Sequence, residues 1–191
     1  MYFKKSDKLI KTIVFFFIIL FLARPLQASE DAGTRKNALK ITFLSLVTGS
    51  VKLTYEMVTF PQQSAELTLG VIGIGFDSFQ VNPKGGLLRA AYKFNLWQPS
   101  QSALSGFYVK PEYAWSFFEY DSKDAGRKHS SMHTIMGCFG YQHEINRLVL
   151  DVFAGAGAGW GDKVEFQYHH GFMERFGWLT LTFGLKVGFS F

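Results

Sequence analysis

The last fourteen residues, WLTLTFGLKVGFSF (Trp178–Phe191), alternate between apolar side chains and polar or very small ones. The apolar positions are Leu179, Leu181, Phe183, Leu185, Val187, Phe189 and Phe191. A period of two predicts a β-strand with one apolar face and one polar face. At about 3.3 Å per residue, such a strand is long enough to cross a bilayer at a tilt, which takes about 9–11 residues.

Seven further segments of the chain show similar alternation, and no helical period of useful length follows residue 37. The predicted strands are 39–47, 51–59, 65–75, 88–96, 107–120, 134–145 and 148–160. Together with the last stretch they predict an all-β fold. We interpret it as an eight-stranded antiparallel up-and-down transmembrane β-barrel that occupies residues 39–191.

Two predicted turns test this assignment. In each strand the apolar, outward-facing residues have either odd or even numbers, and the length of a turn decides whether this parity changes in the next strand. A two-residue loop at Asn146-Arg147 would pair Ile145 with Leu148 and move the outward set from odd to even numbers. The sequence makes this change, since Ile135, Phe139 and Tyr141 are odd and Leu148, Leu150 and Val152 are even. The three-residue Thr48-Gly49-Ser50 loop would keep parity, with Gly49 in the left-handed conformation. A one-residue slip would reverse every side chain, so this agreement supports the register.

Residues 1–28 are predicted to be a secretory signal peptide, followed by a short polar lead over 29–38. A lysine-rich start precedes an apolar run over 13–23 and the small residue Ala28. An uncleaved N-terminal anchor is the alternative. This segment holds +4 of the net charge of +5, so the basic composition is local and predicts no nucleic-acid partner. The single cysteine, Cys138, excludes an intrachain disulfide.

The polar face of the predicted strands carries both signs of charge in nearly equal numbers. Its charged residues are Lys40, Lys52, Glu56, Glu66, Arg89, Lys93, Lys110, Glu112, Glu144, Asp151 and Lys186. Charged side chains cost several kcal/mol against lipid, so this face is predicted to line the interior. We expect a barrel filled by an ion-pair network and not an open pore. The alternatives are a soluble sandwich with these charges in solvent, or a lipocalin-like barrel with its apolar face inward.

The chain resembles the small eight-stranded outer-membrane barrels of the OmpA and OmpX type. It is also similar to a family of exported outer-membrane barrel proteins of unknown function. The stretches that carry the resemblance are Asn37-Ala38-Leu39-Lys40-Ile41-Thr42, 51–56, Gly106-Phe107-Tyr108-Val109-Lys110-Pro111-Glu112 and Leu148-Val149-Leu150-Asp151-Val152. The resemblance implies an outer-membrane location, contact with lipid and no reaction. It also implies insertion by the barrel-assembly machinery, which reads a terminal strand ending on an aromatic residue such as Phe191.

The glycine-rich stretch 155–161 is interpreted as a strand and not as a nucleotide-binding loop. Trp160 takes the place of the third glycine in the G-x-G-x-x-G spacing, and no helix follows. The glycines are expected to make room for bulky neighbours such as Phe153. Ala154, Ala156 and Ala158 would form a smooth outward strip, which we take as a hypothetical contact for a lateral partner or a lipid.

No catalytic, cofactor or metal site is predicted. His169-His170, with Asp162, Glu165 and Glu174 nearby, is the candidate metal cluster, but adjacent histidines on a loop are usually solvated. We therefore expect no bound metal and no cofactor.

An enzymatic alternative comes from barrel-embedded lipid A deacylases, which use a serine, a histidine and an acid. His129 and Ser131 share the outward parity, whereas Glu144 points inward near the opposite end; Glu119 or Asp121 could replace it. The first expectation is a non-enzymatic outer-membrane barrel with a structural or surface-interaction role. A lipid-modifying hydrolase and a small-solute channel are the alternatives.

Overall fold

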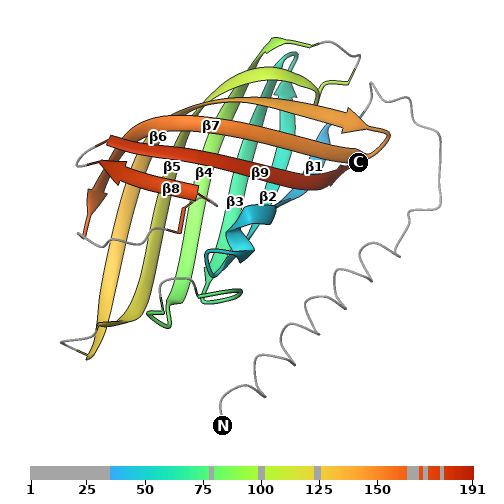
Figure 1. Cartoon of the computed structure of the whole chain (residues 1–191). Coiled ribbons are helices and arrows are strands. Elements are labelled where there is room, and N and C mark those ends of the chain that lie inside the picture. Colours follow the sequence, from blue (N-terminus) through green and yellow to red (C-terminus); the bar gives the residue numbers. More distant parts are fainter. Residues whose placement is uncertain are drawn as a thin grey trace. The chain divides into compact units, whose positions relative to one another are not determined.

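Antiparallel strand pairing builds most of the part of the chain that the computed structural model describes (Figure 1). The structure describes residues 35–77, 80–98, 102–122, 126–162, 168–169, 172–176 and 179–191, with the backbone alone for 172–176. The predicted signal peptide and most of the predicted lead lie outside these residues. Within them, no helix is long and apolar enough to cross a membrane.

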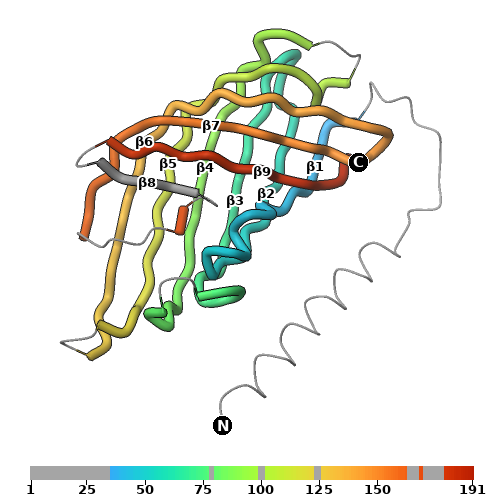
Figure 2. The backbone as a smooth tube through the Cα atoms, in the orientation of Figure 1, coloured from blue at the N-terminus to red at the C-terminus, as the bar shows by residue number. Residues whose placement is uncertain are grey.

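The strands follow one another along the chain with one short 3-10 helix between the first two. They are β1 (Asn37–Thr42), β2 (Ser50–Phe60), β3 (Gln63–Ile72), β4 (Lys84–Trp97), β5 (Gly106–Ser122), β6 (Gly126–Ile145), β7 (Leu148–Gly161), β8 (Phe172–Phe176) and β9 (Leu179–Ser190). The 3-10 helix is η1 (Phe43–Leu46). In Figure 2 the β5–β6 hairpin extends well beyond the neighbouring strands.

Eight of these strands form one ring-like sheet. Each strand from β1 to β6 pairs antiparallel with the next, β7 pairs with β9, and β9 pairs with β1. The closing register runs from Ala38 opposite Ser190 to Thr42 opposite Lys186. Asn37 and Phe191 exchange two backbone hydrogen bonds, with N–O distances of 3.1 and 2.9 Å. The predicted all-β, up-and-down antiparallel arrangement of eight strands is therefore confirmed.

Of the two turns that tested the register, the one at Asn146-Arg147 has the predicted pairing. Ile145 lies opposite Leu148 across the Asn146-Arg147 turn, and Asn146 adopts a positive φ of 59°. The predicted three-residue loop over 48–50 is wrong, because β1 ends at Thr42 and the connection to β2 is longer, but the predicted parity is kept, since Ile41 lies opposite Leu53. Gly49 has the expected left-handed conformation, with φ at 76°. Along the strands, buried and exposed side chains alternate in the predicted sense. Polar groups therefore point into the ring, and apolar groups cover its outer surface.

The predicted first strand is wrong beyond Thr42, where the chain leaves the sheet and forms η1. Local hydroxyl groups stabilise this departure: Ser45 Oγ donates to the Thr42 carbonyl at 2.6 Å, and Thr48 Oγ1 donates to the Ser45 carbonyl at 3.1 Å. Such bonds offer the backbone an alternative to the strand ladder. The predicted start of the sixth strand at residue 134 is also wrong, because β6 begins at Gly126.

A short strand that the alternation did not predict, β8, pairs with the part of β9 that β1 does not reach. β8 covers the segment of β9 from Leu179 to Phe183, and β1 covers the segment from Lys186 to Ser190. Both lie on the edge of β9 opposite β7. Figure 1 shows β8 and β1 following one another along β9. The wall of the ring between β9 and β2 is thus made of β1 and η1, not of one continuous strand.

Apolar clusters fill the interior at three levels. We call the end near Asn37 and Phe191 the terminal end and the other end the distal end. The terminal cluster consists of Ala38, Leu104 and Val149, with Val58 against it. The middle cluster consists of Tyr108, Met136, Cys138 and Phe153. The distal cluster consists of Ile72, Leu87, Phe118 and Tyr168, with Tyr120 against it. Segments outside the strands, carrying Leu104 and Tyr168, thus help to close both ends.

Candidate functional site

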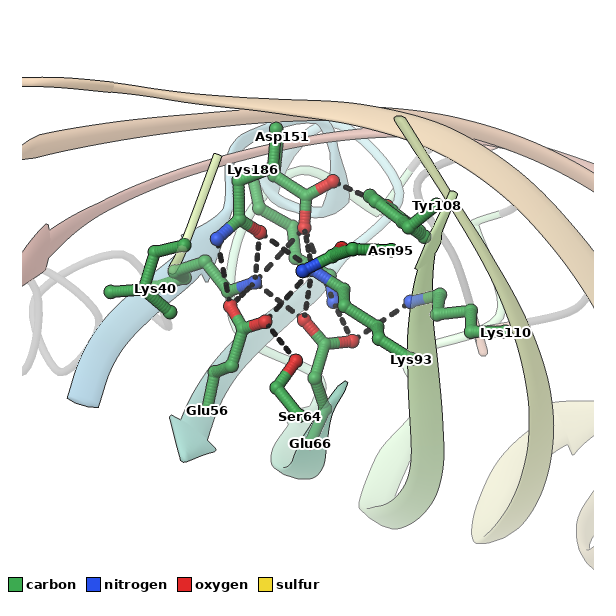
Figure 3. A network of polar contacts seen from close by, with 12 residues as sticks. Lys40, Glu56, Ser64, Glu66, Lys93, Asn95, Tyr108, Lys110, Asp151 and Lys186 are labelled. Atoms are coloured by element: carbon green, nitrogen blue, oxygen red, sulfur yellow. Dashed lines mark hydrogen bonds and ion pairs between the residues drawn. The ribbon is translucent and has the colours of Figure 1, made fainter. Parts of the chain in front are cut away.

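A connected set of buried charges lies inside the ring between the apolar clusters (Figure 3). We call this set the charged network. Its members are Lys40, Glu56, Glu66, Arg89, Lys93, Lys110, Glu112, Asp151 and Lys186, which are joined by ion pairs. Every member is at most 4% exposed. They come from seven strands, so the network ties opposite walls of the ring together.

Lys40 on β1 contacts three carboxylates of the network. Its Nζ lies 2.7 Å from Glu56 Oε2 and 2.9 Å from Asp151 Oδ2, and it also contacts Glu66. It donates a further hydrogen bond of 3.0 Å to Gln142 Oε1. Three carboxylates around one ammonium group compensate much of the cost of removing this charge from water.

Lys93 on β4 reaches the same three carboxylates from another wall of the ring. Its Nζ lies 3.2 Å from Glu56, 3.1 Å from Glu66 and 3.2 Å from Asp151. The same ammonium group sits 4.1 Å from the ring centroid of Tyr108, which is a cation–π contact. Lys40 and Lys93 therefore share their counter-ions, and removing one carboxylate leaves both lysines with too little negative charge.

Glu66 extends the network to two more lysines. Its Oε2 lies 2.9 Å from Lys110 and 2.8 Å from Lys186. Lys110 also pairs with Glu112 at 3.2 Å, and Glu112 lies 3.6 Å from Arg89. This chain of pairs carries the network toward the distal end.

The structure leaves two predicted interior charges outside the network. Lys52 is fully buried and donates to Ser50 Oγ at 2.8 Å, and no carboxylate of the described residues lies within 4.0 Å of it. Glu144 lies at the terminal end, where it pairs with Arg35 at 2.8 Å and accepts hydrogen bonds from Ser102 and Ser190. The structure thus brings nine of the eleven predicted charges together.

Three neutral residues of the interior complete the network and were not predicted. Gln142 donates to Glu56 at 3.0 Å and accepts from Lys40, Ser64 donates to Glu56 at 2.6 Å, and Tyr108 donates to Asp151. All three occupy inward positions of their strands. The parity rule would have found Tyr108 and Gln142 had uncharged polar side chains been considered with the charged ones. It would not have found Ser64, which lies just before the predicted strand 65–75 but within β3.

Three residues of the hydrolase alternative, Glu119, His129 and Ser131, line an open cavity of about 570 Å³ at the distal end, whereas Glu144 lies at the terminal end. His129 Nδ1 is 3.5 Å from Glu119 Oε1, and the hydrogen bond from Arg127 holds the pKa of Glu119 below its usual value. Ser131 Oγ accepts a hydrogen bond of 3.1 Å from Trp115 Nε1. Among the described residues, no hydrogen bond joins His129 to Ser131. A histidine that activates a serine must reach its hydroxyl, and this pair does not.

The two described side chains of the candidate metal cluster, Asp162 and His169, have separate partners. His169 is buried, and its Nδ1 lies 3.2 Å from Thr134 Oγ1. Asp162 instead accepts a hydrogen bond from the Ser131 backbone. His170, Glu165 and the side chain of Glu174 lie outside the described residues. Across the described residues, no group of three histidine, cysteine or carboxylate side chains is arranged to hold a metal ion.

The outer surface of the ring carries aromatic side chains at two levels. Toward the distal end, His133 stacks against Trp115 at 6.1 Å and against Trp160 at 5.7 Å. Toward the terminal end, Phe107 stacks with Trp97 at 5.8 Å and with Phe139 at 5.9 Å. Exposed aliphatic residues lie between these levels. The strip predicted as a lateral contact, Ala154, Ala156 and Ala158, is exposed on the same surface.

Comparisons with known proteins identify no relative: no family model, no curated protein and no solved structure matches this chain.

Proposed function

We propose that this protein is an outer-membrane β-barrel with a structural or surface-interaction role. The observation that carries the proposal is the inverted polarity of the closed sheet. The interior holds fully buried ion pairs such as Lys40–Asp151, whereas large apolar side chains such as Leu69 and Ile135 are more than half exposed on the outside. A protein surrounded by water rarely exposes such a large apolar area. A bilayer would cover it.

The two aromatic levels support this proposal. Tryptophan and tyrosine favour the boundary between hydrocarbon and water, and barrels of this class carry an aromatic girdle at each boundary. Trp115 and Trp160 would mark one boundary, and Trp97 and Tyr141 the other. The resemblance to OmpA-type and OmpX-type barrels supports the same location. In this orientation the chain termini face the periplasm, and the β5–β6 hairpin extends outside the cell.

The predicted signal peptide and strand β9 support a proposed route to the membrane. The signal peptide predicted over 1–28 would direct export, and the barrel-assembly machinery would recognise β9 with Phe191. No molecule other than lipid and this machinery is proposed as an obligatory partner, and no cofactor is proposed.

A filled interior favours a closed barrel over a small-solute channel. The charged network bridges opposite walls, and apolar clusters around Leu104 and Leu87 lie beyond it at either end. Ions crossing the ring would have to break several buried ion pairs at once. We favour the non-enzymatic role over the lipid-modifying hydrolase because His129 and Ser131 lack the contact that the reaction needs.

Heat-modifiability in the membrane fraction tests the proposal. We expect the protein in the outer-membrane fraction, with the unboiled form migrating faster on a gel than the boiled form. A protein that is released with the periplasm and shows no mobility shift would overturn it. Planar-bilayer recordings separate the closed barrel from a channel, since discrete conductance steps would contradict a filled interior.

A further inference from the structure

We infer that the distal half of the interior contains a binding site for an oxyanion of the phosphate class, centred on Lys52 and Arg89. This site depends on the closed sheet alone and goes beyond the proposed structural role. Four features carry it: an imbalance of buried charge, a lysine without a carboxylate, an adjoining arginine, and buried hydroxyl groups available for further hydrogen bonds.

The buried charges of the ring do not balance. Among the described residues, six buried side chains are cationic and four are anionic. The cations are Lys40, Lys52, Arg89, Lys93, Lys110 and Lys186; the anions are Glu56, Glu66, Glu112 and Asp151. Glu144 does not correct this excess because it already pairs with Arg35. The described part of the interior therefore has an excess of two positive charges, which a bound dianion would neutralise.

The excess is concentrated near Lys52. Its side chain is 0% exposed, and its one hydrogen bond within the described structure goes to Ser50. Burying an ammonium group without a counter-ion is expensive, because one neutral hydroxyl cannot replace its hydration. An anion beside Lys52 would remove this cost.

Arg89 shares an interior surface with Lys52. Thr54 follows Lys52 on the inward face of β2 and hydrogen bonds Thr68 on β3 at 2.7 Å. Thr68 lies opposite Arg89 on β4. A lysine, two threonines and an arginine thus line three adjacent strands. Arg89 also lies 3.6 Å from Glu112, which it shares with Lys110. A guanidinium group suits phosphate because its parallel N–H groups match two phosphate oxygens.

Two buried hydroxyl groups border this surface. Thr42 lies beside Lys52, because Ile41 pairs with Leu53 and the next residues along the two antiparallel strands are Thr42 and Lys52. Ser116 lies opposite Leu87, the inward neighbour of Arg89 along β4. Thr42 Oγ1 and Ser116 Oγ are both buried without a hydrogen-bond partner among the described residues. Buried hydroxyl groups are normally paired, so these two are available as donors to a bound oxyanion.

The wall beside Lys52 suggests two sources for the anion. Ser50, the partner of Lys52, donates to the Ser45 carbonyl of η1 at 3.3 Å. On its outward side η1 exposes Phe43 and Leu46. A phosphate carried by a lipid would approach through this non-strand segment, whereas free phosphate would enter from the distal end. Both place the same oxyanion between Lys52 and Arg89.

Calorimetric titration of the folded full chain in detergent tests the site, with inorganic phosphate and dihexanoyl phosphatidate as the two probes. We expect saturable binding of one equivalent, weakened about tenfold or more by Lys52→Met. The matched control is Lys128→Gln, which removes an exposed lysine and should bind as the natural protein does. Tighter binding of phosphatidate than of phosphate identifies a lipid headgroup as the ligand, and equal binding identifies free phosphate.

A second variant, Ser116→Ala, guards against misfolding of Lys52→Met. It removes one hydroxyl group and is expected to weaken binding about threefold or more without changing the unboiled mobility of the protein. The inference is overturned if neither probe binds saturably to the folded protein. It is also overturned if folded Lys52→Met and Ser116→Ala both bind as tightly as Lys128→Gln. Neither outcome bears on the outer-membrane location.

Discussion

Lys40 and Asp151 meet inside the ring, with 2.9 Å between Nζ and Oδ2, although 111 residues separate them along the chain. They belong to β1 and β7, which are not neighbours in the sheet because β9 lies between them. The pair can form only after the ring has closed. It therefore reports on the tertiary structure and not on any single hairpin.

Asp151→Asn is expected to destabilise the folded protein by about 3 kcal/mol. The substitution leaves Lys40, Lys93 and Lys186 buried with one carboxylate fewer, and breaking a buried pair from one side is costly. Urea unfolding in lipid vesicles, followed by tryptophan fluorescence, measures the change. The control is Asp121→Asn, which weakens an exposed pair with Arg127 and should cost less than about 1 kcal/mol. Equal losses would show that the network contributes no special stability.

Leu181→Arg and Leu148→Arg form a matched pair that tests the outer surface. Both leucines are 42% exposed. Leu181 lies midway between the two aromatic levels, because it pairs with Ala156, which pairs with Gly137, and Gly137 is halfway along β6 between His133 and Tyr141. Leu148 is the first residue of β7 and lies at the terminal end. If lipid covers this surface, Leu181→Arg should cost about 2–4 kcal/mol and Leu148→Arg about 0–1 kcal/mol. The same vesicle unfolding assay applies. Two neutral substitutions would mean that the surface faces water.

Gly157→Ala is expected to disturb the β6–β7 pairing, while Gly137→Ala is tolerated. A Cβ on Gly157 would overlap the backbone of Ile135 and Met136, whereas the nearest atom to a Cβ on Gly137 is 4.0 Å away. Overpacking of this kind typically costs about 1–3 kcal/mol. The fraction of protein that keeps the fast unboiled mobility after refolding measures the effect. Equal folding of the two variants would contradict the close approach of the strands.

Asn146→Gly should leave stability unchanged within about 0.5 kcal/mol, while Asn146→Ala should lower it by about 1 kcal/mol. Asn146 has a φ of 59°, which glycine adopts freely and alanine does not. Unfolding midpoints of the two variants, compared with the natural chain, give the difference. A more stable alanine variant would show that the turn can adopt another conformation.

The glycine-rich part of β7 shows how far the sequence interpretation extends. It predicted a strand with room for Phe153, and β7 is that strand. The glycine that faces the Phe153 ring, however, is Gly184 on β9, while Gly155 lies against Cys138. Alternation along one strand cannot reveal this partner, because it depends on the register between β7 and β9.

The sequence by itself determined the strands that alternate, the side of each strand that faces inward, and the parity change at Asn146-Arg147. These properties have a local cause, since successive side chains on an extended backbone point to opposite faces. Only the tertiary structure decided that β1 ends at Thr42, that β8 covers the rest of β9, and that Lys52 stands apart from the carboxylates that surround Lys40. The end of β1 also depends on the local hydroxyl bonds of Ser45 and Thr48. The other two outcomes depend on how the ring closes, because closure sets which part of β9 is left for β8 and which inward side chains come within reach of one another.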